Sequence, residues 1–333
     1  MRHITVCNYG DFLGVRSERL IIKSKSGEIY ETPLSRVRSI RVMKAGVSLS
    51  STLIEACASR GIRLFFCDWT KTCISALTPT NQHAVVNVRR AQFKCIESPA
   101  CRRIACEMIL SKIRNQRAVL LYFDKYLRGV SKEKSRLLRG AAESLEEVAL
   151  RIQVSLDESE SEDWRGGLLA KEGAAAKIYW RVLSSCLLLP SSFTGRTGRG
   201  ATEITNAALN YAYAVLYSYC FAALDNAGLE FYAGFLHSNR PGKASLVLDF
   251  MEEYRPWIVD RNIIKHRKTL KTMPFLTQEI KRQIISSIDQ TLLAKQLWRG
   301  KRLRVENIMQ RQAYRLCGAM RNDKPYKGIR FKW

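Results

Sequence analysis

The chain has 333 residues, 46% of them hydrophobic, which suits a globular protein of about two domains. We find no apolar run of about 18 residues and no signal-peptide pattern at the N-terminus, so we expect a cytoplasmic protein that does not cross a membrane. Lysine and arginine number 55 against 30 acidic residues, a net charge of +25, which favours nucleic acid as the partner, with an acidic protein or an anionic membrane surface as alternatives.

The first 80 residues are expected to form a small β-domain. Three runs rich in β-branched residues predict strands at residues 19–23, 37–42 and 62–66. Polar, glycine-containing turns at residues 8–11 and 25–28 are typical of hairpins. Between the last two strands, a short helix that starts near Ser50 and ends at Gly61 is expected, so the pattern is that of a small meander with one helix.

After this β-domain the pattern becomes helical. Residues 78–83 are a polar break, and we place the linker between the two domains at residues 81–92. Apolar residues at helical spacing predict helices at 101–127, through the 130s and 140s, and at about 167–188, 205–227, 249–255 and 277–320. Residues 157–163 are too acidic and polar to pack, so we expect an exposed loop there. The predicted fold class is α+β, with a small N-terminal β-domain (1–80) followed by a larger all-α domain (93–333).

Ten cysteines are scattered along the chain without a C-x-x-C pair, which argues against a zinc ribbon or a redox motif. Several lie in apolar surroundings, as Cys67 does after Leu64, Phe65 and Phe66. We therefore expect reduced, buried thiols.

The first candidate for chemistry is Glu172, in the helix expected at residues 167–188. Gly173 and three alanines follow it, and such small residues allow a helix backbone to lie close to whatever it packs on. A glutamate beside that surface can be held near buried groups. The alternative is a solvated glutamate at a helix start, where the helix dipole favours a negative charge.

The second candidate is His237, which ends an apolar stretch and precedes a polar turn containing Arg240, Gly242 and Lys243. A strand or helix end presents a ligand at a loop mouth in this way. The alternative is an ordinary hydrogen-bonded histidine. The chain has four histidines, so a histidine-rich metal site is not expected.

The third candidate is Asp249, which follows three apolar residues, so its carboxylate is expected to be buried and to need a cation or hydrogen-bond donors. Glu252 lies one helical turn further along the same face. Two carboxylates on one face raise each other's pKa unless a cation sits between them. The alternative is a helix start, with Asp249 as the N-cap and Glu252 completing a capping box.

Together these segments resemble the CRISPR-associated adaptation endonuclease family, the integrases that insert new spacers into CRISPR arrays. The resemblance covers essentially the whole chain, and the motifs agree in order and spacing. Similar strings are found at residues 32–37, 47–50 and 61–66 in the β-domain, at 104–105, 112–113 and 115–116 in the first long helix, at 172–179 around the glutamate, at 206–211 in the next helix, and at 234–237 and 248–256 around the histidine and the aspartate.

The resemblance implies a divalent-metal site formed by Glu172, His237 and Asp249, with Glu252 as a lower-ranked ligand. Carboxylate oxygens with one imidazole suit Mg²⁺ or Mn²⁺ better than zinc. The implied chemistry is phosphodiester transesterification, in which a prespacer 3′-hydroxyl attacks a phosphate of the repeat. If the same site accepts water, the protein acts as an endonuclease. We see no serine–histidine–acid arrangement around His237, so no covalent nucleophile is expected.

Polar loops and helices near these motifs supply candidate DNA contacts. Those expected to bind phosphates are Arg196, Arg199, Arg240 and Lys243, with general surface charge as the alternative. Those expected to stack on or hydrogen-bond the substrate are Tyr179 and Tyr217, with helix packing as the alternative.

The C-terminal region is the most basic part of the chain. Residues 261–333 contain 19 lysines and arginines and four acidic residues. We expect the last segment, residues 321–333, to be a mobile arm that binds phosphates or docks a partner. A solvated terminus is the alternative.

The resemblance also implies partners. They are double-stranded DNA (the prespacer and the CRISPR repeat), a second copy of the chain in a homodimer formed largely through the β-domains, and a small ferredoxin-like CRISPR adaptation partner that completes a heterohexamer. Three other functions fit the residues: a homologous transposon-encoded DNA integrase, a non-catalytic basic DNA-binding scaffold, and a junction-resolving or repair nuclease.

Overall fold

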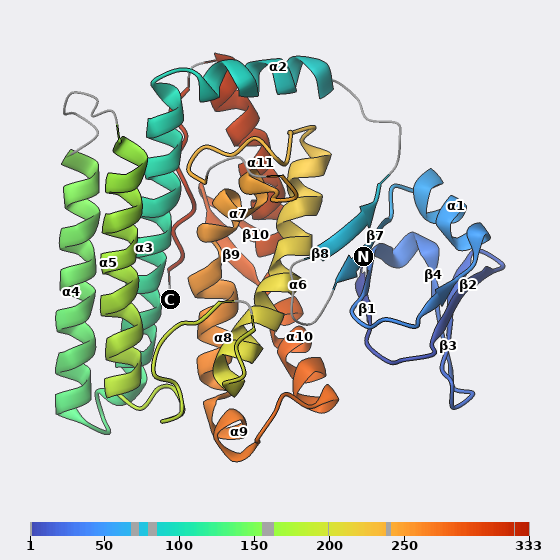
Figure 1. The fold of residues 1–333 in the computed structure, drawn as a ribbon, viewed down its shortest axis with the longest axis horizontal. Coiled ribbons are helices and arrows are strands. Elements are labelled where there is room, and N and C mark those ends of the chain that lie inside the picture. Colours follow the sequence, from blue (N-terminus) through green and yellow to red (C-terminus); the bar gives the residue numbers. More distant parts are fainter. Residues whose placement is uncertain are drawn as a thin grey trace.

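A computed structural model describes residues 2–67, 73–78, 85–154, 163–198, 200–237, 241–322 and 324–332. A small β-rich part, blue in Figure 1, is joined to a larger helical part. This is the predicted α+β architecture. Of the acidic loop predicted at residues 157–163, all but Asp163 lies outside the described residues.

The described residues of the N-terminal part form two four-stranded sheets, with the strand orders β1-β5-β7-β8 and β4-β3-β2-β6. The elements of this part are β1 (Arg2–Val6), β2 (Phe12–Arg16), β3 (Arg19–Lys23), β4 (Ile29–Pro33), the short 3-10 helix η1 (Leu34–Arg36), β5 (Val37–Val42), β6 (Ser48–Leu49), α1 (Ser51–Ser59), β7 (Arg63–Cys67) and β8 (Cys73–Leu77). The predicted strands correspond to β3, β5 and β7. The predicted helix is α1, and the N-cap Ser50 accepts a hydrogen bond from the Leu53 N–H.

The turns of the β-domain agree only in part with the prediction. Residues 25–28 turn the chain between the antiparallel strands β3 and β4, with Gly27 in the left-handed region at φ +89°. Residues 8–11 join β1 to β2, which lie in different sheets, so the hairpin predicted there is wrong. A tight hairpin joins β2 to β3 instead, where Ser17 and Glu18 have φ values of 47° and 60°. Because neither is a glycine, no strong turn signal marked this hairpin.

Most of the chain after residue 84 is helical. The elements are α2 (Val85–Ile96), α3 (Ala100–Leu127), α4 (Lys132–Val154), α5 (Trp164–Ser185), α6 (Ile204–Asn226), α7 (Ser245–Glu252), the π-helix η2 (Arg255–Asp260), α8 (Arg261–Lys265), α9 (Arg267–Thr272), α10 (Gln278–Leu293), β9 (Lys295–Trp298), β10 (Lys301–Arg304) and α11 (Val305–Asn322). Helix α2 begins inside the segment where we placed the linker. The single helix predicted at 277–320 is wrong, because Arg299 and Gly300, with positive φ values, turn the chain into the β9–β10 hairpin between α10 and α11.

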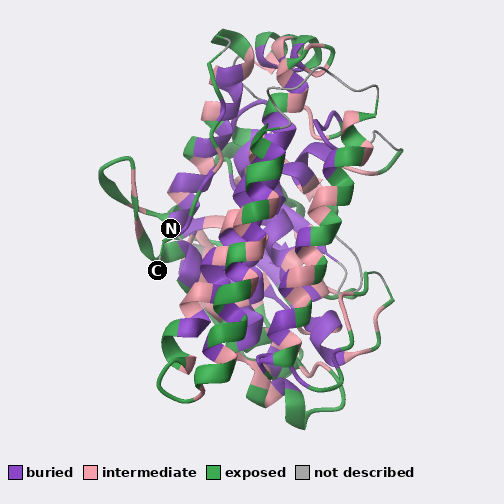
Figure 2. Ribbon diagram, turned by 90° about the vertical axis from the view of Figure 1, so that its left-hand side faces the viewer, coloured by how far each residue is buried: buried purple, intermediate pink, exposed green. Residues whose placement is uncertain are grey.

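Helix α6 is a core element of the helical part. It is long and apolar enough, by length and composition, to cross a membrane, so the expectation that the chain has no such run is wrong. In the structure 72% of that apolar window is buried, and α7, α10, α11 and η2 pack around the helix. Figure 2 shows the same pattern across the molecule, with buried residues inside and exposed residues on the outer faces of the surface helices. Helix α6 therefore packs against protein along most of its length.

The sheet β1-β5-β7-β8 joins the two parts of the molecule. Phe65 and Cys67 of β7 belong to the buried core that continues into the helices. Arg41 of β5 is fully buried, and its Nη2 atom lies 3.2 Å from Asp289 Oδ1 of α10. The Arg41 guanidinium also lies over the ring of Tyr219 in α6. A buried charge that depends on partners from two helices ties the sheet to the helical part.

All ten cysteines are free thiols and nine of them are buried, as predicted. Burial raises the pKa of the Cys57 and Cys106 thiols to about 11. These thiols are therefore protonated at neutral pH and have a packing role.

The C-terminal segment is docked on the helical part. Ile329 and Phe331 are buried, and the Phe331 ring stacks on Trp257 of η2 with 5.5 Å between the ring centroids. The Phe331 N–H donates to Asn115 Oδ1 of α3 at 2.9 Å, and the Asn115 side chain donates to the Ile329 carbonyl at 3.0 Å. Figure 1 shows the chain end beside α3. The predicted mobile arm is therefore wrong for residues 324–332, because apolar side chains and backbone hydrogen bonds hold the segment in place.

Candidate functional site

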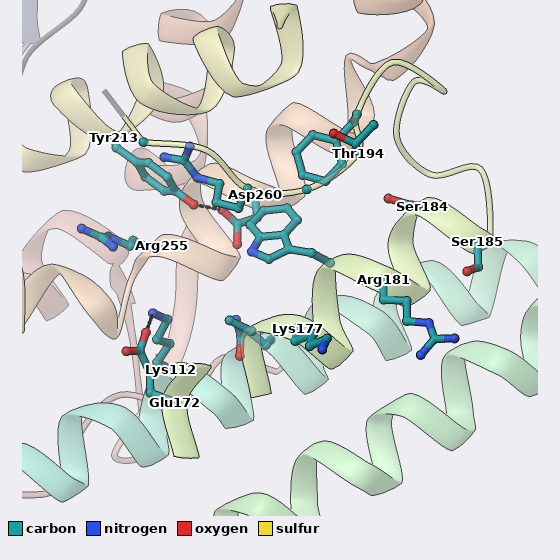
Figure 3. A pocket seen from close by; sticks show the side chains of 17 residues that line it. Lys112, Glu172, Lys177, Arg181, Ser184, Ser185, Thr194, Tyr213, Arg255 and Asp260 are labelled. Carbon is teal, nitrogen blue, oxygen red and sulfur yellow. Dashed lines mark hydrogen bonds and ion pairs between the residues drawn. The ribbon is translucent and has the colours of Figure 1, made fainter. Parts of the chain in front are cut away.

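A cavity of about 950 Å³ lies where α3, α5, α6 and η2 meet. The side chains that line it are mostly polar or aromatic: Lys112, Gln116, Glu172, Lys177, Trp180, Arg181, Ser184, Ser185, Phe193, Thr194, Arg196, Tyr213, Arg255 and Asp260. Figure 3 shows Lys112 and Glu172 at one end of the cavity and Arg181 and Ser185 at the other. Of the predicted metal ligands, Glu172 is the one that lies on the cavity wall.

Glu172 and Glu252 converge on one ammonium group. The Lys112 Nζ atom donates a hydrogen bond to Glu172 Oε1 and lies 2.6 Å from Glu252 Oε2. The other oxygen of Glu252 is paired with Arg255 Nη1 at 2.7 Å. Lys112 belongs to α3, Glu172 to α5 and Glu252 to the end of α7, so three helices that are distant in sequence meet at this point.

Charge pairing outweighs burial in this cluster. Burial alone would lower the pKa of the Lys112 ammonium, but the carboxylates of Glu252 and Glu172 raise that pKa above its usual value. Burial alone would raise the pKa of Glu252, but Arg255 and Lys112 lower it. Both Lys112 and Glu252 are therefore charged at neutral pH, and either would be costly to leave buried without its partner.

Asp249 holds the loop that carries His237. The N–H groups of Phe235 and Leu236 donate to Asp249 Oδ2 at 2.7 and 2.9 Å, and the His237 N–H donates to Oδ1 at 3.2 Å. Gly234 permits this approach, since a Cβ atom on it would lie 2.7 Å from Asp249 Oδ2. Asp249 is an interior residue of α7, so the N-cap alternative is wrong. The Asp249 carboxylate therefore binds backbone N–H groups of the preceding loop, at residues 235–237, and does not cap its own helix. We call it the loop cap.

The same carboxylate orients the His237 ring. The Nδ1 atom of His237 contacts Asp249 Oδ1, so the tautomer with hydrogen on Nδ1 would leave Nε2 as the nitrogen that can bind a ligand. The His237 side chain is 25% exposed. His237 is therefore an imidazole whose ring is held by Asp249 of α7.

The structure divides the predicted ligand set into two pairs. Asp249 binds His237, while Glu172 and Glu252 bind Lys112. Among the residues that the structure describes, no three carboxylate, imidazole or thiol groups lie close enough together to hold an ion. The predicted convergence of Glu172, His237 and Asp249 is therefore not seen. The reason is that Asp249 is engaged by backbone N–H groups, and it is the lower-ranked Glu252 that faces Glu172.

A further buried carboxylate lies on the cavity wall. Asp260, at the end of η2, accepts a hydrogen bond from the Tyr213 hydroxyl at 2.5 Å, and burial raises the pKa of Asp260 to about 6. The guanidinium groups of Arg196 and Arg255 lie over the Tyr213 ring, 5.3 and 5.0 Å from its centroid. Figure 3 shows the Tyr213–Asp260 contact across the cavity from Lys112. The wider turn of the π-helix, a form found often at functional sites, brings Arg255 and Asp260 to the same cavity.

The four residues predicted to contact phosphates differ in their position relative to the cavity. Arg196 lines the cavity, where its guanidinium donates to two asparagine side chains of α6 at 3.1 and 2.6 Å. Lys243 is partly buried just before α7 and is not among the residues that line the cavity. Arg199 and Arg240 lie outside the described residues. Arg196 is therefore the one of these four for which the structure gives a place at the cavity.

The two tyrosines predicted to contact DNA are buried. Tyr179 is 0% exposed and Tyr217 is 7% exposed. The Tyr179 ring contacts Trp180 at 4.9 Å between centroids, and the Tyr217 ring contacts Phe221 at 6.3 Å. Helix packing, the alternative for both, describes their positions, since both rings are buried among other aromatic side chains.

Sequence reasoning missed several cations of the cavity itself. Lys177 and Arg181 of α5 line it and, being four residues apart, share a helix face, but neither lies three, four or seven residues after Glu172, so a helical wheel would not have grouped them with it. Lys112 lay in one of the family-like strings. Nothing in that string marked its ammonium as the partner of a glutamate 60 residues away.

Comparison with known proteins identifies related chains. The family model described as CRISPR associated protein Cas1 matches residues 4–313. The chain is 43% identical to the CRISPR-associated endonuclease Cas1 1 of Francisella tularensis subsp. novicida (strain U112), over 100% of both chains. Two solved structures share its fold. One is a casposase bound to an integration product (TM-score 0.79, 21% identity, 98% of this chain and 93% of that one), and the other is a chain of a Cas6-RT-Cas1–Cas2 complex (TM-score 0.77, 20% identity, 99% of this chain and 36% of that one).

Proposed function

Because the chain belongs to the Cas1 family of CRISPR-associated adaptation endonucleases, we propose that it is a divalent-metal-dependent DNA integrase and endonuclease. It would join prespacer 3′-hydroxyl ends to the CRISPR repeat by phosphodiester transesterification. The observation that carries this proposal is the meeting of Glu172 and Glu252 at one cation on a cavity wall. The name of the Francisella relative (an endonuclease) and the integration product in the casposase structure support the same class of chemistry.

Glu172 and Glu252 offer oxygen donors of the kind that a hard divalent cation prefers. Glu172 and Glu252 already converge on a cation, Lys112, and Glu252 Oε2 is buried without a hydrogen bond of good geometry. A buried carboxylate oxygen of this kind gains most from a metal ion. We assign Glu172, Glu252 and the Nε2 atom of His237 as the groups that would hold Mg²⁺ or Mn²⁺, with Asp249 as the residue that positions His237. When bound, the ion would offset the negative charge of the phosphate and of the attacking or leaving oxygen.

The remaining cavity residues would bind and orient DNA. The guanidinium and ammonium groups of Lys177, Arg181 and Arg196 line the same cavity as Glu172 and suit phosphate oxygens. Trp180 lines the cavity, is half-buried and packs on the buried Phe193 with 5.6 Å between ring centroids, and such an aromatic face suits an unpaired base. The attacking group in this reaction is a DNA 3′-hydroxyl, so the protein needs no covalent nucleophile of its own. Its role would be to hold two DNA segments so that the 3′-hydroxyl of one faces the phosphate of the other.

The expected partners fit the surface of the β-domain. Several large apolar side chains are exposed there: Tyr9, Phe12, Ile29, Tyr30 and Ile74. We propose that this surface contributes to a homodimer. One solved complex contains Cas1 with Cas2, and we propose that two such dimers assemble in the cytoplasm with the small ferredoxin-like adaptation partner into a heterohexamer.

An integration assay tests this function directly. A prespacer duplex, a supercoiled plasmid with a CRISPR array, the adaptation partner and Mn²⁺ or Mg²⁺ should give strand-joined products that disappear in EDTA. Glu172→Gln and His237→Ala should abolish joining while DNA binding persists. Full joining by Glu172→Gln would rule out Glu172 as a metal ligand, whereas DNA binding without any joining by the natural protein would leave only a DNA-binding scaffold. Preferential joining to transposon ends, or branched-DNA cleavage that outpaces joining, would instead favour the transposon integrase or the junction nuclease.

A further inference from the structure

The ammonium of Lys112 stands where the proposed function requires a metal ion. Its Nζ atom contacts Glu172 Oε1 and lies 2.6 Å from Glu252 Oε2. All three side chains are largely buried, with 11%, 22% and 4% exposure for Lys112, Glu172 and Glu252. We propose that Lys112 is an exchangeable counter-ion, which holds the two carboxylates together before a divalent cation binds and leaves them when it does. This inference rests on the proposed function, because it takes Glu172 and Glu252 as metal ligands.

Two buried carboxylates that face each other require a cation. Without one, their mutual repulsion and the cost of burying charge would push the side chains apart or unfold the site locally. Lys112 supplies that charge from inside the chain. It thereby keeps Glu172 and Glu252 near the positions in which a metal ion would need them.

The ammonium and the metal compete for the same oxygen atoms. A divalent cation that binds both carboxylates at about 2.0 to 2.5 Å would take the place between Glu172 and Glu252 that the Lys112 ammonium now occupies, and it would repel that ammonium. Metal binding at this point therefore includes breaking the ion pairs of Lys112. The observed free energy of metal binding would therefore equal the favourable free energy of binding to the two carboxylates less the free energy needed to break the ion pairs of Lys112.

Lys112 is free to move in a way that Arg255 is not. A lysine ammonium is a point charge on a flexible four-carbon stem, and Lys112 lines a cavity of about 950 Å³ that can receive it. Arg255 pairs with the other oxygen of Glu252 and lies over the ring of Tyr213, 5.0 Å from its centroid. Glu252 therefore keeps one anchor while Lys112 exchanges with the ion.

Mn²⁺ titration of the full-length protein without DNA, followed by the electron paramagnetic resonance signal of free Mn²⁺, tests the exchange. Lys112→Met keeps the length of the side chain but removes the competing charge, so it should bind Mn²⁺ about tenfold or more tightly than the natural protein. Lys171→Met removes the same charge from the residue next to Glu172 in the chain. It should leave the affinity nearly unchanged, which separates exchange from a general effect of charge.

A second variant keeps the test decisive if Lys112→Met folds poorly. Lys112→Arg retains a cation whose planar fork binds carboxylates more firmly, so Mn²⁺ affinity should fall about tenfold. The proposal that Lys112 is an exchangeable counter-ion would be overturned by unchanged or weaker Mn²⁺ binding of a folded Lys112→Met, or by unchanged Mn²⁺ binding of Lys112→Arg. Glu172→Gln identifies which proposal has failed: if it binds Mn²⁺ as tightly as the natural protein, the metal site itself is misplaced.

Discussion

Asp249 and Glu252 lie one turn apart on α7 and are similarly buried, at 1% and 3% exposure, yet their partners differ in kind. Asp249 accepts hydrogen bonds from three backbone N–H groups of the loop at residues 235–237. Glu252 is paired with the side-chain cations of Lys112 and Arg255. A loop backbone cannot leave its acceptor without local unfolding, whereas a lysine ammonium can move away. The availability of a buried carboxylate to a ligand is therefore set by whether its present partner can leave.

Glu253, the next residue along the chain, extends the comparison. It accepts hydrogen bonds from the Tyr326 hydroxyl and, at 2.7 Å, from the Ile329 N–H of the C-terminal segment. Both donors are neutral. Burial consequently raises the pKa of Glu253 to about 7, while at Glu252 the nearby cations overcome burial and lower the pKa. Three carboxylates within five residues thus have three roles: a loop cap, a candidate ligand and an anchor for the chain end.

The largest expected effect separates the ligand from the loop cap. Glu252→Gln should reduce strand joining by more than about 100-fold, because even the outer partners of metal ligands cost 10- to 100-fold when removed. Its DNA affinity should change little, since the cavity cations remain. Strand joining and filter binding measured on the same preparation check this. Joining at the natural rate would show that Glu252 is no more a ligand than Asp249 is.

Removal of the loop cap, the Asp249 carboxylate, should instead lower the stability of the folded protein. Asp249→Ala leaves three backbone N–H groups without their acceptor, so the free energy of unfolding should fall by about 3 kcal/mol or more. Glu252→Gln should be less destabilising because its amide oxygen can still accept a hydrogen bond from Arg255 and because Lys112 keeps Glu172 as its partner. Urea unfolding of both variants measures the difference. Equal stability of the two variants would contradict the view that Asp249 holds the loop while Glu252 does not.

The sequence predicted these carboxylates only in part. The apolar run before Asp249 correctly indicated burial and a need for donors or a cation. Which of these it receives depends on a loop that folds over it, and the close approach at Gly234 is visible only in three dimensions. The ion pair of Glu252 could not be predicted for the same reason, since its partner Lys112 lies 140 residues earlier in the chain.

The fold shows the same limit. The strands β3, β5 and β7 and most long helices could be predicted, because hydrophobic periodicity is a local property of the sequence. The docked C-terminal segment could not, because a high density of lysine and arginine concealed the buried Ile329 and Phe331. The prediction that the small residues after Glu172 let the helix backbone lie close to its neighbour holds only in part. Ala175 is buried, but Gly173 is exposed and has open space around it.

The docking of the C-terminal segment gives the next prediction. Phe331→Ala should lower the free energy of unfolding by about 3 kcal/mol, because it empties the contact with Trp257. Lys332→Ala, a change at the exposed neighbour, should stay within about 0.5 kcal/mol of the natural protein. Thermal or urea unfolding checks both. A mobile arm would give the opposite pattern, with no loss of stability from Phe331→Ala and weaker DNA binding from Lys332→Ala.

The smallest expected effect is a pH dependence at Glu253. Its pKa in the folded protein, about 7, is above the ordinary value of 4.5, so its contribution to stability is complete below pH 4.5 and is lost as the pH rises through 7. Glu253→Gln mimics the protonated form and cannot ionise. The free energy of unfolding of the natural protein should therefore decline relative to that of the variant across this window. Parallel curves would show that Glu253 ionises as it would in water.

The central claim is that Glu172, Glu252 and His237 hold the ion while Asp249 only positions His237. Crystals grown with Mn²⁺ and measured near the manganese absorption edge test it most directly. The account predicts one anomalous peak about 2.0 to 2.5 Å from a carboxylate oxygen of Glu172, from Glu252 Oε2 and from His237 Nε2, with Lys112 displaced and the backbone hydrogen bonds of Asp249 intact. A peak bound by Asp249 with Lys112 still between Glu172 and Glu252 would contradict it.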